Sequence, residues 1–518
     1  MTREKSQASG LHRLDRQALD FALVETLQYA GNGLAHLPGH ARFWNEKANV
    51  LETFADKVVA ETALLVLLTD RVPGPSAALR RVRMELIRDL VPLARSDRLR
   101  LLIMRYPQTA CSLGFAHTAL TASGVPDDAF DAVVTSAFQS GQVYATDRLP
   151  FRSMDVVWQE GLRSPGRLGC IQHQLEGSIL IADPPPSACS SIPEQAYALT
   201  HAIFYTTDFG QRPLPEKVVR ERLRSTVDAV LAWRLAREDF DLIGELLLAV
   251  CCSGMEWSPY CWLAWRTLVD AREQLGEVPG PNLDSLHRNT LSPVEARAYA
   301  YRHTYHTMYV FGLLCAQLLG FPETASPALA GQVADDADGG ALDCNASYSS
   351  ASSTRGSLAI EWPERSTGAE EASEGSFGGH RDRLDRLLNF ADPEGTLLFL
   401  RGAVLNSDID WKVVAGVLMD CALVRSARAY DLPRAAYGLL EVVRLSLPAS
   451  RVSLDVAEFL ARQQFRADAT RHPLPVSQAT SEVLQARDFI GSSLSVFARF
   501  LRESGRSDVM KSPVVNEY

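Results

Sequence analysis

The feature that most constrains the fold is the helical spacing of apolar residues, which runs through almost the whole chain. Segments such as LDRQALDFALVETLQYA and EKVVRERLRSTVDAVLAWRLA carry apolar residues at three- and four-residue steps. Strand-like alternation is scarce, and proline-containing turns such as RVPGPS and EVPGPN separate the segments. The pattern predicts an all-α protein in which about ten to twelve antiparallel helices over residues 10–325 form a large bundle or a toroid of helical hairpins.

Residues 326–380 interrupt this pattern. The segment is rich in Ser, Ala and Gly and holds nine acidic residues against two arginines. Its DDADGGALD stretch has the acids of an isoprenoid-cyclase metal motif, but such a motif needs a regular helix, which two glycines disfavour. Because the segment has too little apolar surface to offset its ordering entropy, we expect a disordered acidic linker. Residues 381–506 return to the helical period and predict a smaller helical bundle without evident chemistry.

Composition and charge narrow the class of protein. The 518 residues are 46% hydrophobic, yet no run of 18 uncharged apolar residues occurs and the N-terminal sequence is polar. The net charge is -10, without the basic stripe that phosphate binding requires. The nine cysteines are scattered, without C-x-x-C pairs. We therefore expect a cytoplasmic protein that binds a small molecule and neither nucleic acid nor membrane, with a protein partner or homodimer left open.

The first candidate site is the stretch THAIFYTTDFG, residues 200–210. A continuous helix would place His201, Tyr205 and Asp208 on one side of an otherwise apolar segment. An aspartate beside a histidine can hold one imidazole tautomer and raise its basicity, as general acid or base catalysis requires. We predict that His201 is a proton acceptor oriented by Asp208 and that Tyr205 binds substrate. The alternative is a hydrogen-bonded core histidine with a solvated aspartate at the helix end.

The second candidate site is YRHTYHTMYVFGLLCA, residues 301–316. His303 and His306 are one turn apart, and Arg302 and Tyr309 share the His306 side. We predict that His306 and Tyr309 polarise or protonate the substrate, that His303 binds it in the pocket wall, and that Gly312 permits a close helix contact. Zinc would need a third ligand such as His201, so no metal or cofactor is expected. A half-solvated amphipathic helix is the alternative.

The segment RLPFRSMDVVWQEGL could add substrate contacts, since Arg152, Asp155 and Trp158 follow one another at three-residue steps. Arginine has a planar fork of donors that suits a carboxylate or a sulfate leaving group. We therefore predict that Arg152 or Arg302 holds an anion and that Trp158 lines the pocket. The nearby RLGCIQHQLEGSIL segment offers further polar residues, which are more often surface than site.

Three stretches, LTHAIFYTTDFG, YHTMYVFGLLCA and LPFRSMDVVWQ, resemble the hallmark segments of an uncharacterised bacterial all-helical family, a domain of unknown function associated with natural-product gene clusters. The resemblance covers about residues 10–325 and implies no settled activity. The arrangement of a large helical part followed by a small one is similar, more distantly, to the sulfate-eliminating enzymes that close aziridine rings in azinomycin-type biosynthesis. That likeness rests on architecture and implies no residue roles.

Two functions are compatible with these patterns. One is a biosynthetic enzyme, a lyase or cyclase, that performs cofactor-independent elimination or intramolecular cyclisation on a polar small molecule. The other is a non-catalytic helical scaffold or ligand-binding protein. No phosphate-binding loop, nucleophile elbow, zinc-protease or kinase motif is present. The enzyme hypothesis requires the His201 and His306 helices to face one cavity.

Overall fold

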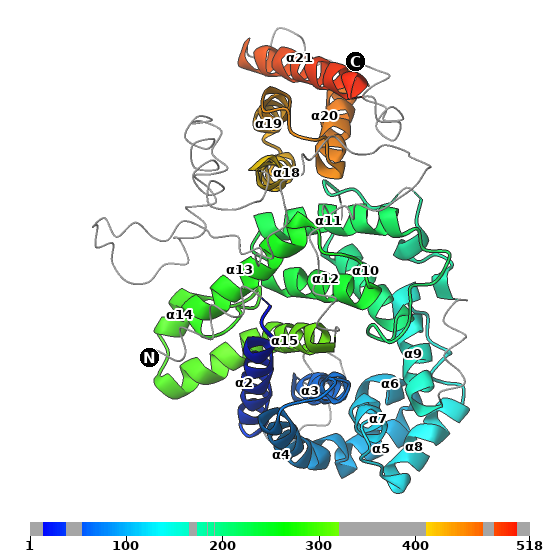
Figure 1. Cartoon of the computed structure of the whole chain (residues 1–518). Helices are drawn as coiled ribbons and strands as arrows, with labels where there is room; N and C mark the ends of the chain where they lie inside the picture. The colour runs from blue at the N-terminus through cyan, green and yellow to red at the C-terminus, as the bar shows by residue number, and fades with distance from the viewer. Residues whose placement is uncertain are drawn as a thin grey trace, which may run out of the picture.

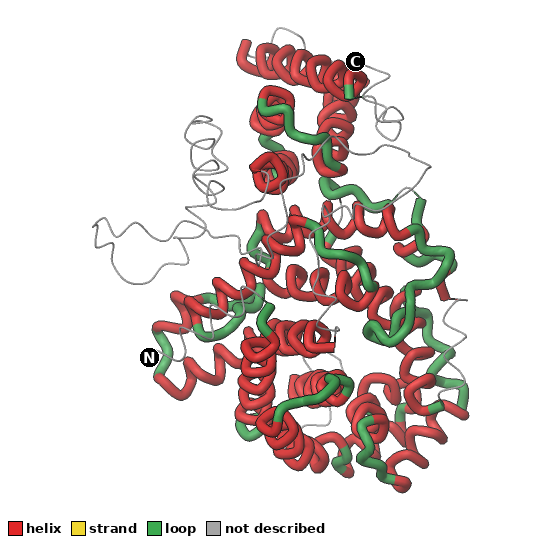
Figure 2. The backbone as a smooth tube through the Cα atoms, in the orientation of Figure 1, coloured by secondary structure: helices red, strands yellow, loops and turns green. Residues whose placement is uncertain are grey.

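The computed structural model describes residues 14–37, 54–164, 174–183, 185–190, 192–320, 411–469 and 481–504. Within these ranges the regular elements are eighteen α-helices and two short 3-10 helices, and none is a strand (Figure 2). The predicted all-α class is therefore confirmed. The predicted linker, residues 326–380, lies outside the described ranges. Within them, no helix combines the length and apolarity needed to cross a membrane.

The helices of the larger part fall into two groups in chain order. The first group is α2 (Arg16–Leu34), α3 (Phe54–Asp70), α4 (Ala77–Ala94), α5 (Asp97–Arg105), η1 (Pro107–Thr109), α6 (Ala110–Leu113), α7 (Phe115–Ala122), α8 (Asp128–Gln139) and α9 (Pro150–Arg163). The second group is η3 (Ile179–Ile181), α10 (Pro193–Thr206), α11 (Arg220–Ala236), α12 (Phe240–Ser253), α13 (Pro259–Leu275), α14 (Ser285–Asn289) and α15 (Pro293–Gly320).

Helices α3, α7, α9, α10, α12 and α15 form a closed ring (Figure 1). Each of them packs on the next in this order, and α15 packs back on α3. Helices α2 and α4 pack on the α3 and α15 side of the ring, and α11 and α13 pack on α12. The apolar stripes of these helices bury one another in one continuous core.

The C-terminal helices α18 (Trp411–Arg428), α19 (Leu432–Arg444), α20 (Arg451–Ala469) and α21 (Ser481–Glu503) stack outside the ring (Figure 1). Helix α18 packs on α11 and α13, and α20 also contacts α11. The Arg428 guanidinium lies 3.3 Å from the ring centroid of Trp233 and donates to the Ala188 carbonyl at 2.9 Å. The Asp455 carboxylate accepts from the Ala188 N–H at 2.8 Å. The smaller helical part therefore shares apolar and polar contacts with the larger one.

The ends of two helices decide where the candidate residues lie. The Asp239 side chain accepts from the Leu242 N–H and so caps the first turn of α12, which ends at a left-handed Gly254. Helix α10 ends at Thr206, and Asp208 and Phe209 both have positive φ angles, of 47° and 50°. The prediction of a continuous helix through Asp208 is therefore wrong, because the helix ends and the chain turns before that residue.

The close contact predicted at Gly312 is confirmed. A Cβ atom on Gly312 would lie 2.5 Å from Thr26 Cγ2 and 3.3 Å from Leu65 Cδ1, so α15 approaches α2 and α3 through this glycine. We expect Gly312→Ala to lower the free energy of unfolding by about 1–3 kcal/mol, because the added methyl overpacks the contact. Chemical denaturation measures this loss. Gly320→Ala on the same helix is the control, because a Cβ there has no atom of the described residues within 4 Å. Equal losses in both variants would contradict the prediction.

Candidate functional site

A cavity of about 320 Å³ lies inside the ring, within reach of every ring helix. Its wall combines aromatic side chains with acids, two histidines and two cations, as a small-molecule site does. The residues that line it are Asp56, Lys57, Ala60, Glu61, Leu64, Cys111, Ser112, Leu113, Phe115, Arg152, Asp155, Trp158, Gln159, His201, Phe204, Tyr205, Phe209, Glu245, Leu248, His306, Val310 and Leu313.

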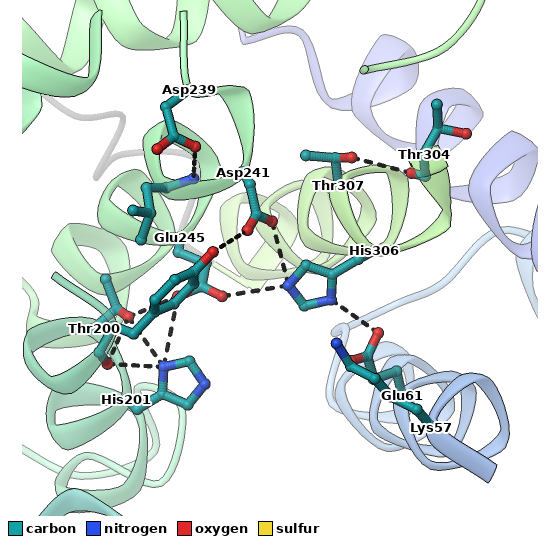
Figure 3. Close-up of polar contacts among 12 residues, drawn as sticks. Lys57, Glu61, Thr200, His201, Asp239, Asp241, Glu245, Thr304, His306 and Thr307 are labelled. Atoms are coloured by element: carbon teal, nitrogen blue, oxygen red, sulfur yellow. Dashed lines mark hydrogen bonds and ion pairs between the residues drawn. The ribbon is translucent and has the colours of Figure 1, made fainter. Parts of the chain in front are cut away.

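A carboxylate–histidine cluster lies beside this cavity, and its residues come from α3, α12 and α15 (Figure 3). His306 Nε2 lies 3.2 Å from Asp241 Oδ1 and 3.4 Å from Glu245 Oε1. The other ring nitrogen of His306, Nδ1, lies 2.8 Å from Glu61 Oε2. One imidazole is therefore held between two acids of α12 on one side and one acid of α3 on the other.

Helix α12 presents Asp241 and Glu245 on one face because they are four residues apart. Both are buried, with 4% and 3% of their surface exposed. Tyr197 OH donates to Asp241 Oδ2 at 2.6 Å, and Thr200 Oγ1 donates to Glu245 Oε2 at 2.7 Å. Each carboxylate thus has one oxygen fixed by α10, and the other oxygen faces His306.

The charges of the cluster shift one another's pKa values. Burial by itself would lower the pKa of His306, but the carboxylates of Glu61, Asp241 and Glu245 outweigh it and raise this pKa well above its usual value. Burial opposes ionisation of Glu61 as well, yet His306 holds the pKa of Glu61 below its usual value. Burial also opposes ionisation of Glu245, but His201 and His306 hold the pKa of Glu245 below its usual value. Burial, with Glu245 nearby, raises the pKa of Asp241.

His201 approaches the same cluster from α10. Its Nδ1 lies 2.9 Å from the Tyr197 carbonyl oxygen and 3.5 Å from Glu245 Oε2. Because a carbonyl only accepts, Nδ1 carries the proton and Nε2 is left as an acceptor. No hydrogen bond to Nε2 is found among the described residues, and His201 lines the cavity. The helices around positions 204 and 306 therefore face one cavity, as the enzyme hypothesis requires, and Glu245 lies between their histidines.

Asp208 does not orient His201. Its Oδ1 accepts from Arg71 Nη2 at 3.0 Å and from Trp158 Nε1 at 2.8 Å, and Arg71 also donates to the Asp208 carbonyl at 2.9 Å. The predicted pairing fails because α10 ends before Asp208, so this side chain leaves the His201 face. The acid nearest to His201 comes instead from α12, as Glu245.

Three other predicted residues, Arg152, Trp158 and Tyr205, line the cavity. Tyr205 hydrogen-bonds to Asp155, and burial is the main cause that raises the pKa of both groups. Arg152 is exposed, with its guanidinium 4.9 Å from the ring centroid of Phe151. The cavity wall therefore has a cation toward solvent and a protonatable acid deeper inside.

The remaining predicted residues lie elsewhere. His303 and Arg302 line a second cavity, of about 360 Å³, to which Asp241 and His306 also contribute. Tyr309 lines neither cavity, because its hydroxyl is taken by Thr62 at 3.0 Å and Tyr301 at 2.9 Å. The prediction that Tyr309 contacts substrate has no support in this geometry. His306 lines both cavities, whereas Glu245 lines the first and Asp241 lines the second. These three residues therefore form the partition between the two cavities.

The sequence prediction missed the acids of the cluster: Glu61, Asp241 and Glu245. A signal for them exists, since each stands in a strongly apolar helical segment, AETALLVLL or DLIGELLLAV. A carboxylate at such a position is largely shielded from water and needs a cation, a donor or a proton nearby. The four-residue spacing of Asp241 and Glu245 marks a common face. Reading these segments only as apolar stripes hid that signal.

The fold and the site together define an all-helical protein with a closed helical ring around a carboxylate–histidine cluster, of which Asp241 and Glu245 are buried and His306 and Glu61 are partly buried. A family model described as a domain of unknown function, DUF6895, matches residues 34–316, more than half of the chain, and the chain belongs to this family. No curated protein and no solved structure matches the chain. The matched range contains the whole cluster, and the resemblance to an uncharacterised family is thereby confirmed. The links to natural-product gene clusters and to aziridine formation stay predictions.

Proposed function

We propose that this protein is an enzyme that performs acid–base chemistry on a polar small molecule bound inside the helical ring. The observation that carries the proposal is the arrangement of His201. Its Nδ1–H is held by the Tyr197 carbonyl, so its Nε2 lone pair is available at the wall of the cavity. A fixed tautomer with a free acceptor nitrogen is what a general base needs.

His201 would remove a proton from the substrate, and the carboxylate of Glu245 would stabilise the imidazolium that forms, because the two groups lie 3.5 Å apart. In an elimination or an intramolecular cyclisation, the electron pair of the broken C–H or N–H bond forms the new bond. The leaving group departs with its own bonding pair and needs no change of redox state. Arg152, at the exposed end of the cavity wall, would hold an anionic leaving group such as sulfate.

The size and lining of the cavity support a single small substrate. A volume of about 320 Å³ is at the lower end of the range for small-molecule sites. Trp158, Phe204 and Phe209 give the wall an apolar side, and the acids and histidines give it a polar side. These features favour an amphiphilic metabolite, in line with the natural-product substrates that we propose as the wider class.

The test is a comparison of His201→Ala with wild type on a metabolite extract, followed by mass spectrometry. We expect wild type to consume a metabolite and form a product lighter by a leaving group, or an isomer if the ring closes without loss. Removing the base should slow this conversion by about 10²- to 10⁴-fold. His36→Ala is the matched control, since His36 Nδ1 makes the same type of bond to a carbonyl four residues back, at 2.7 Å, but is exposed and outside the cavity.

Circular dichroism must show that both histidine variants keep the helical content of wild type. If wild type retains a metabolite without changing it, the ligand-binding function replaces the enzymatic one. If His201→Ala converts the metabolite as fast as His36→Ala does, His201 is not the base and the proposed mechanism fails.

A further inference from the structure

We propose that Asp241, Glu245 and His306 form a binding site for one divalent transition-metal ion at the partition between the two cavities. The inference adds to the proposed function of the same pocket. It rests on the geometry of the cluster, on the residues that orient its donor atoms and on its charge.

The donor atoms are already near the spacing that a metal ion requires. Two ligands that bind one ion at about 2.1 Å lie roughly 3.0–3.4 Å apart at octahedral or tetrahedral angles. His306 Nε2 lies 3.2 Å from Asp241 Oδ1 and 3.4 Å from Glu245 Oε1. The three donor atoms all lie within 4.8 Å of one another. Small side-chain rotations would bring them around one ion.

Each of the three ligands has a second residue that orients it. Glu61 accepts from His306 Nδ1–H, which leaves Nε2 as the donor to the metal. A carboxylate on the far nitrogen of a metal-binding histidine is a recurrent feature of metal sites, because it fixes the tautomer. Tyr197 and Thr200 hold the outer oxygens of Asp241 and Glu245 in the same way (Figure 3).

The His306 side chain does not satisfy the hydrogen-bonding needs of the cluster by itself. Asp241 Oδ1 is buried and lies 3.2 Å from His306 Nε2. Among the described residues, however, no donor is oriented to give this oxygen a hydrogen bond. A single N–H points at one acceptor, and Glu245 Oε1 takes it. A buried carboxylate oxygen without a donor is costly, and it is aimed at the place where the ion would bind.

The charge balance points the same way. Three carboxylates, of Glu61, Asp241 and Glu245, face one imidazole, of His306, and one ammonium, of Lys57, which is 3.5 Å from Glu61. Acidic side chains therefore outnumber basic ones around this place, which suits a bound cation.

The donor set favours Mn²⁺, Fe²⁺ or Zn²⁺ over Mg²⁺ and Ca²⁺, because imidazole nitrogen binds the transition metals better than it binds hard cations. Three protein ligands leave coordination positions open, and the ligands line both cavities. A substrate in the larger cavity could bind the ion directly, and His201 lies beside Glu245 to take the proton that such an ion acidifies.

The experiment uses the full chain, stripped of metal with EDTA and titrated with Mn²⁺ or Zn²⁺ alone. We expect one ion per chain by calorimetry and elemental analysis, and a nitrogen coupling from one histidine in pulsed electron paramagnetic resonance of the Mn²⁺ form. Glu61→Gln should weaken binding by about 10- to 100-fold, and Asp241→Asn and His306→Gln by at least as much. Asp155→Asn is the matched control, because this acid lies in the same cavity outside the cluster and should leave binding unchanged.

The proposal fails if wild type binds neither ion in a saturable way, or if Asp241→Asn and His306→Gln leave binding unchanged. If a ligand variant does not fold, two other measurements test the site. These are the nitrogen coupling in the Mn²⁺ form of wild type and the metal affinity of the Glu61→Gln variant, and absence of the coupling together with an unchanged affinity would disprove the site. Binding is measured without substrate, so a chain that binds no metal but loses turnover in His201→Ala would disprove the metal site and retain the proposed function.

Discussion

His306→Leu is expected to lower the free energy of unfolding by about 3–5 kcal/mol in the presence of EDTA, the largest loss among the substitutions considered. The substitution removes the cation between Glu61, Asp241 and Glu245 and keeps a side chain of similar volume. Removing one partner of a buried ion pair is costly, because it leaves an uncompensated charge. Here it leaves three carboxylates around one apolar side chain. Urea denaturation followed by circular dichroism measures the loss.

Two further variants isolate the cause of that loss. His303 lies one turn away on α15, and its half-buried imidazole packs against Tyr299 with 4.4 Å between the ring centroids. The His303→Leu substitution should lower the free energy of unfolding by less than about 1 kcal/mol. Adding Asp241→Leu to His306→Leu should recover at least ~1 kcal/mol, because one of the repelling charges is removed. If the His306→Leu variant is as stable as the His303→Leu control, the three acids do not need His306 as their counter-charge.

Asp208→Ala is expected to lower the free energy of unfolding by about 2–4 kcal/mol. Asp208 is buried and accepts from Arg71 and Trp158, so its removal leaves an arginine and an indole N–H in the interior without this acceptor. The positive φ of 47° adds a cost for alanine, which rarely adopts that conformation. Thermal and chemical denaturation give the loss.

Asp208→Asn separates this structural role from the catalytic role that the sequence predicted. Asparagine tolerates a positive φ and keeps an acceptor oxygen for Trp158, so it should cost less than about 1 kcal/mol. It should leave conversion of the substrate close to the wild-type rate, since Glu245 is the acid beside His201. A large loss of rate with unchanged stability in Asp208→Asn would restore the predicted pairing of His201 with Asp208.

Much of the fold could be predicted from the sequence, since helical periodicity and proline turns are local signals. The all-α class and the close contact at Gly312 follow from such signals. The pairing of His201 with Asp208 failed for a local reason as well. The pattern does not reveal that α10 ends at Thr206, because the end depends on the left-handed turn that follows.

The sequence by itself determined that the chain forms helices and that His201 and His306 stand on largely apolar ones. Periodicity fixes which side chains share a face, because that depends only on the 3.6-residue turn. Only the tertiary structure decided which faces meet. Glu61, Asp241 and Glu245 reach His306 because α15 packs on both α3 and α12. That packing brings His306 together with residues that are 61 and 245 positions away along the chain. The partner of a buried charge is set by that packing and by no spacing along the chain.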